Sequence, residues 1–143
     1  MVAKISVGNS LYGALAYNGE KINEAKGRLL NTNRIFNDGT GTVDINKAME
    51  GFLTFLPPQM KVEKPVVHIS LNPHPEDVLT DTELQDIARE YLEKLGFGNQ
   101  PYLVFKHEDI DRHHLHIVTV NVDENGKRLN RDFLYRRSDR IRR

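Results

Sequence analysis

Residues 102–122 read YLVFKHEDIDRHHLHIVTVNV, two apolar runs on either side of a short charged segment. The runs 102–107 and 114–122 are rich in the β-branched and aromatic residues that favour strands. The segment 108–112 between them is acidic and short enough to join antiparallel neighbours. We therefore predict that the two runs pair as a β-hairpin.

Three histidines of this hairpin are predicted to share one face. His114 and His116 are two residues apart, and alternate residues of a strand point to the same side. His107 lies opposite or near His114 if the runs pair, and residues paired across a ladder also share a face. Three imidazoles on rigid strands can hold one divalent cation and leave coordination positions open. His113 points the other way and reads as structural, whereas His68 could line the site.

The imidazole donors limit which cations the site can bind but do not identify one. Imidazole suits zinc, manganese, iron or nickel, while magnesium prefers oxygen ligands. Phosphate oxygens could fill the open positions, and the metal would then act as a Lewis acid on a phosphodiester. We expect Mn²⁺ or Mg²⁺, with Zn²⁺ as an alternative. Asp109 could orient a ligand through its second ring nitrogen, although a loop carboxylate without that role fits the spacing nearly as well.

The rest of the chain predicts an α+β domain. Residues 2–7 and 66–71 read as strands, and residues 18–43 read mostly as loop, with a helical turn near 24–30. We expect helices from Ser10 toward Tyr17, from Asp44 to Leu56, from the Thr80–Glu83 capping box to Gly96, and from Phe133 onward. This order predicts one domain over 1–143, a mainly antiparallel sheet with helices packed on one face.

Composition excludes several classes of protein. Apolar residues make up 38% and charged residues 28%, which is typical of a soluble globular domain. No apolar run approaches the roughly 20 residues that span a bilayer. The absence of cysteine excludes disulfides and thiolate zinc sites. We expect a cytoplasmic protein without a membrane partner.

The net charge is zero, but the charge is unevenly distributed. Residues 127–143 hold eight Lys or Arg and two Asp, a net charge of +6, so the preceding residues carry −6. This asymmetry predicts a basic segment that contacts DNA phosphates, with a solvated helix face as the alternative. The candidate DNA-binding residues are Lys127, Arg128, Arg131, Arg136, Arg137 and Arg140.

The spacing His107-x-Asp109-x4-His114-x-His116 resembles the third motif of conjugative and mobilization relaxases, in the HUH endonuclease superfamily. Those proteins usually have Pro before the His-x-His pair, where this chain has His113. The departure affects the loop geometry and leaves the three ligands intact.

A second likeness lies near the N-terminus. Residues 3–5, followed by SLYGALAY at 10–17, resemble the tyrosine motif in relaxases of mobilizable elements from Bacteroides-like bacteria, with Tyr17 in the place of the tyrosine. Together the two likenesses cover nearly the whole chain. Tyr12, five residues earlier and about 140° around a helix, is the rival nucleophile.

The resemblance implies a specific chemistry. The Tyr17 hydroxyl would attack a phosphate at an origin of transfer, become linked to the 5′ phosphate and free a 3′ hydroxyl. A cation on the three histidines would stabilise the developing charge, with Asp109 supporting the catalytic site. Single-stranded DNA would be the substrate, with accessory mobilization proteins and a coupling protein as further partners. The resemblance also implies that the family's C-terminal helices are cut short here, which would reduce activity.

Three alternatives stay open from the sequence. A rolling-circle replication initiator or a transposase of the same superfamily would carry similar residues. A catalytically idle DNA-binding module could keep the fold. A metal-dependent hydrolase of small phosphodiesters would leave Tyr17 structural, although the basic segment favours a polymeric anion.

Overall fold

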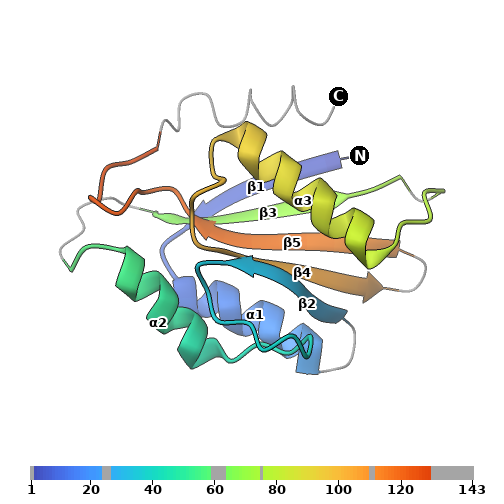
Figure 1. The fold of residues 1–143 in the computed structure, drawn as a ribbon, viewed down its shortest axis with the longest axis horizontal. Coiled ribbons are helices and arrows are strands. Elements are labelled where there is room, and N and C mark those ends of the chain that lie inside the picture. The colour runs from blue at the N-terminus through green and yellow to red at the C-terminus, as the bar shows by residue number, and fades with distance from the viewer. Residues whose placement is uncertain (1, 24–26, 59–63, 75, 110–111, 130–143) are drawn as a thin grey trace.

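A five-stranded antiparallel sheet organises the part of the chain that the structure, a computed structural model, describes: residues 2–23, 27–58, 64–74, 76–109 and 112–129. In spatial order the strands are β1 (Val2–Gly8), β3 (Val66–Asn72), β5 (Arg112–Val120), β4 (Tyr102–Asp109) and β2 (Gly27–Asn33), as Figure 1 shows. Every neighbouring pair is antiparallel. The predicted α+β class and antiparallel sheet are confirmed.

Three helices complete the described fold: α1 (Leu11–Asn23), α2 (Ile45–Phe55) and α3 (Asp81–Leu95). The predicted caps of α2 and α3 are present. Asp44 accepts a hydrogen bond from the backbone N–H of Lys47, and Thr80 and Glu83 form both bonds of a capping box. Gly96 ends α3 in the left-handed conformation at φ 93°, which glycine adopts without strain.

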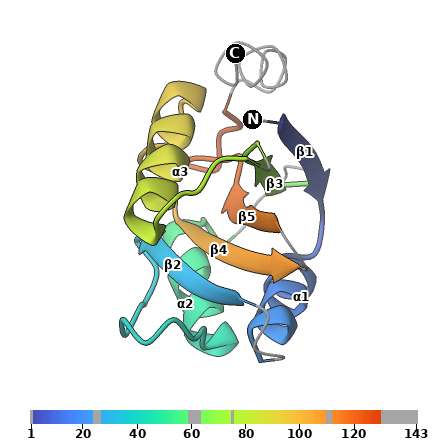
Figure 2. The same cartoon turned by 90° about the vertical axis from the view of Figure 1, so that its right-hand side faces the viewer.

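The helices cover both faces of the sheet, so the prediction that they pack on one face was wrong. Val104 and Ile117 pack with α3, whereas their neighbours Phe105 and Val118 pack with α1 and α2. Figure 2 shows α3 on one side and the other two helices on the opposite side. The central strands are buried on both faces, and such strands read as continuous apolar runs without alternation.

Strand β2 lies in the segment expected to be mostly loop with a helical turn, and α1 continues beyond Tyr17 to Asn23. β2 is an edge strand with a register shift between Leu29 and Asn31, which breaks its side-chain alternation. At its start, a Cβ on Gly27 would lie 2.1 Å from the carbonyl oxygen of Lys106, so only glycine fits this close approach.

Several smaller predictions also have an outcome. The strand expected over 66–71 is β3. After β5 the chain turns at 123–126, where the N–H of Gly126 donates to the carbonyl of Asp123. The helix expected from Phe133 lies outside the described residues. Among the residues described, no helix is long and apolar enough to cross a membrane.

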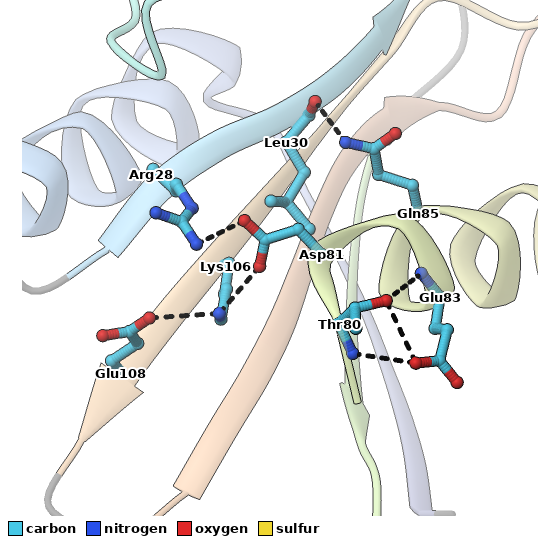
Figure 3. A network of polar contacts seen from close by, with 8 residues as sticks. All are labelled: Arg28, Leu30, Thr80, Asp81, Glu83, Gln85, Lys106 and Glu108. Atoms are coloured by element: carbon cyan, nitrogen blue, oxygen red, sulfur yellow. Dashed lines mark hydrogen bonds and ion pairs between the residues drawn. The ribbon is translucent and has the colours of Figure 1, made fainter. Parts of the chain in front are cut away.

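An ionic network ties the start of α3 to β4 and β2 (Figure 3). The nearly buried ammonium of Lys106 lies 2.8 Å from Asp81 and 3.1 Å from Glu108, and Arg28 also pairs with Asp81. Gln85 donates to the carbonyl of Leu30, one turn further along α3. Burial, the largest influence, raises the pKa of Asp81, but Lys106 and Arg28 together outweigh it, so the pKa is lowered.

We predict that Asp81 makes folding stability fall in acid. Because its folded pKa is lowered, its contribution is complete above the unfolded value near 4 and is lost as pH falls through the folded pKa. Asp81→Asn should cost about 1–3 kcal/mol at pH 7, and this difference from wild type should shrink by pH 3, measured by urea unfolding. Asp86→Asn is the control, since Asp86 forms an exposed pair with Arg89. A cost for Asp81→Asn that is the same at both pH values would contradict the prediction.

Candidate functional site

The predicted hairpin forms, and it gathers the three histidines of the motif. His107 pairs with His114 across β4 and β5, and Phe105 pairs with His116. Since His107 follows Phe105 by two residues, all three imidazoles belong to one face of the sheet. The His107 and His116 rings stack, with centroids 4.1 Å apart and planes at 27°. His107 is buried, and the other two side chains are partly buried.

This is the face that α1 and α2 cover. Phe105 precedes His107 by two residues and Val118 follows His116 by two, so both lie on the same side of the cluster along the ladder. They belong to the core that includes Leu15 of α1 and Phe52 of α2. The histidine cluster therefore continues an apolar core toward one end of the sheet, where rigid strands hold it.

Strand β3 adds polar side chains that sequence reasoning largely missed. His68 Nε2 lies 3.1 Å from His116 Nδ1, so His68 lines the cluster as expected. Asn72 Oδ1 contacts His114 Nδ1, and the Asn72 amide nitrogen donates to Ser70 Oγ at 3.1 Å. The sequence alone indicates that His68, Ser70 and Asn72 share one face of β3. They alternate with apolar residues that are fully buried on the other face.

The environment of the cluster disfavours positive charge. Burial, followed by the proximity of His107, His68 and His114, lowers the pKa of His116 to about 3. Burial also lowers the pKa of His68. Both rings are therefore neutral at pH 7 and keep a nitrogen lone pair, as metal ligation by imidazole requires.

The donors fit a divalent cation by type, but not yet by orientation. Imidazole nitrogens suit manganese and zinc, and an amide oxygen lies beside them. The His107 and His116 rings stack, and within the described ranges no group of three His, Asp or Glu side chains is arranged to hold a metal. Binding would require a change in side-chain torsion angles.

Both candidate nucleophiles lie on α1. Tyr17 is 55% exposed and Tyr12 is 58% exposed, so exposure does not separate them. Tyr17 lies in the middle of the helix and not at its end, because the buried positions Leu15, Asn18 and Ile22 extend α1 to Asn23. Through Leu15 the helix packs on the face of the sheet that bears the histidines.

One known protein family matches most of this chain. The family model described as "Relaxase: MobA/VirD2-like, nuclease domain" matches residues 17–143, which include Tyr17 and the whole histidine hairpin. The chain belongs to this relaxase family. No curated protein and no solved structure matches the chain. The narrower likeness to relaxases from Bacteroides-like bacteria stays a prediction.

Family membership gives the function of this relaxase at a coarse level. A relaxase nuclease domain acts on DNA as a nicking enzyme in mobilization, so DNA is the partner. The metal, the nucleophile and the covalent intermediate remain predictions for this chain.

The remaining candidate residues of the relaxase lie at the edge of the described structure. Asp109 ends β4 opposite Arg112, and its side chain is outside the described part. Lys127 and Arg128 are exposed, just after β5. The other candidate DNA contacts, Arg131, Arg136, Arg137 and Arg140, lie outside the described residues.

Proposed function

We propose that this relaxase cleaves one DNA strand at an origin of transfer through Tyr17 and remains covalently bound to the 5′ phosphate. His107, His114 and His116 would hold the divalent cation, Mn²⁺ or Mg²⁺, with Zn²⁺ as a third candidate. The observation that carries the proposal is the imidazole cluster on the sheet face that α1 covers, in a chain of the relaxase nuclease family.

The chemistry is a balanced exchange of phosphodiester bonds. The phenol oxygen of Tyr17 attacks phosphorus, the bond from phosphorus to the 3′ oxygen breaks, and that oxygen leaves as a 3′ hydroxyl after taking up a proton. The phenol proton passes to a base, for which Asp109 is our candidate. When bound, the cation supplies Lewis acidity that withdraws electron density from the scissile phosphate.

The exposure of the tyrosines supports a polymeric substrate. A phenol is a poor nucleophile at neutral pH because it is almost fully protonated, so it requires activation where the phosphate binds. Tyr12 and Tyr17 both present more than half of their surface to solvent, and a DNA strand can reach them without an opening of the fold.

A labelling experiment tests the proposal. The protein is incubated with Mn²⁺ and a random-sequence pool of single-stranded DNA, labelled either at the 3′ or at the 5′ end, and is analysed on a denaturing gel. We expect the 3′ label alone to migrate with the protein. Cleavage without protein-bound label would indicate a hydrolase that uses water, and binding without cleavage would indicate an idle DNA-binding module.

We also predict that DNA binding is mainly electrostatic and uses the basic segment 127–143. Affinity for single-stranded DNA should fall with salt, with a logarithmic slope of about −0.7 for each phosphate contacted. Reversing Arg136, Arg137 and Arg140 to Glu should flatten that slope by about 2 if each contacts one phosphate, measured by fluorescence anisotropy. Arg89→Glu, on the outer side of α3, is the control. An unchanged slope in the triple variant would place the DNA elsewhere.

A further inference from the structure

We propose that Asn72 of β3, held by Ser70, is a positioning residue that fixes the tautomer of His114 and leaves its Nε2 as the metal-binding nitrogen. The role of this arrangement in metal binding rests on the proposed function. The arrangement itself concerns only contacts within the chain, so it can be tested without metal or DNA.

The register of the sheet explains why these residues meet. Strand β3 pairs with β5 through Ser70 opposite His116 and Leu71 opposite Leu115. The next position in this antiparallel ladder brings Asn72 beside His114. Leu71 is fully buried in the core under α3, so Ser70 and Asn72 belong to the opposite face, which is the face of the histidine cluster.

The chemistry of the amide assigns the ring proton. Asn72 Oδ1 is the atom that contacts His114 Nδ1, and a carbonyl oxygen can only accept. Nδ1 must therefore carry the hydrogen. A neutral imidazole has a single N–H, so Nε2 of His114 keeps its lone pair. A ring held in this state binds a cation through Nε2 without first shifting a proton between its nitrogens.

Ser70 holds the other end of the Asn72 amide. The Asn72 nitrogen donates to Ser70 Oγ, and the carbonyl oxygen of the same amide faces His114. If the amide were flipped, its nitrogen would donate to Nδ1, the proton would reside on Nε2, and the serine hydroxyl would donate to the amide oxygen. The two arrangements predict opposite tautomers and can be distinguished.

The first test reads the tautomer in metal-free protein by two-bond ¹H–¹⁵N correlation spectra of the imidazoles at pH 8. We expect wild-type His114 to be protonated at Nδ1 and not at Nε2. Asn72→Asp should keep this tautomer because a carboxylate can only accept. Ser70→Ala should give a mixture, Asn72→Leu should remove the preference, and Ser6→Ala, at an exposed position on β1, is the matched control. A wild-type proton on Nε2, or a switch of tautomer in the Asn72→Asp protein, would overturn the proposal.

The second test measures Mn²⁺ affinity by calorimetry. Asn72→Leu should weaken binding about 10–100-fold, the range typical for loss of a group that orients a metal ligand. Asn72→Asp should restore affinity to within a few-fold of wild type. An Asn72→Leu protein with unchanged affinity would overturn the positioning role. If wild type binds no Mn²⁺ while His114 carries its proton on Nδ1, the proposed metal function fails and the assignment of Asn72 stands.

Discussion

Replacing His114 with alanine should abolish most of the stabilisation that a divalent cation gives this protein. Wild type should bind about one equivalent of Mn²⁺ or Zn²⁺, and at 100 times the dissociation constant binding adds about 2.7 kcal/mol to the free energy of unfolding. The reason is that His114 faces His107 across the hairpin and lies two residues from His116. Calorimetry gives the stoichiometry, and thermal melts with and without metal give the stabilisation.

The control is His74→Ala, because His74 is an exposed histidine outside the cluster, and its metal response should match wild type. His114→Gln covers the case in which the alanine variant folds poorly, since glutamine keeps a polar side chain of similar reach. If a folded variant with all three histidines replaced by alanine binds metal as wild type does, the site is elsewhere.

Local patterns predicted the boundaries of α2 and α3 well. The capping box at Thr80 and Glu83 and the terminating Gly96 act within one or two turns of the backbone, so the residues themselves carry the information. The histidine hairpin was also predictable, because strand alternation and antiparallel pairing need only the neighbouring sequence.

The failures concern interactions between distant segments. Nothing local reveals that Leu103 and Val104 are buried against helices on opposite faces. Strand β2 was missed because its polar side chains form hydrogen bonds with residues that are distant in the sequence. Asn33, for example, donates to the carbonyl of Gln100. Strand alternation places Asn72 on one face with His68 and Ser70, but its contact with His114 spans 42 residues and could not be predicted locally.

Tyr17→Phe should abolish covalent capture of single-stranded DNA, by about a thousandfold or more, which is typical when a catalytic nucleophile is removed. The change removes one hydroxyl and keeps the ring, and the side chain is exposed on α1, so folding and metal binding should survive. Attack requires the nucleophilic oxygen and the phosphorus to lie within about 3 Å of each other. If a water molecule replaced the missing hydroxyl as the nucleophile, the cleaved DNA would carry no bond to the protein. The amount of protein that carries the 3′ label measures the effect.

Tyr12→Phe is the matched control, because Tyr12 lies on the same helix with nearly the same exposure and should still form the adduct. The two residues are separated by about 140° around α1, so one bound phosphate cannot be presented to both hydroxyls in the same way. If Tyr12→Phe loses the adduct and Tyr17→Phe keeps it, the nucleophile is Tyr12 and the covalent mechanism stands. If the double variant still captures DNA, neither tyrosine is the nucleophile, and the role that we assign to α1 is wrong.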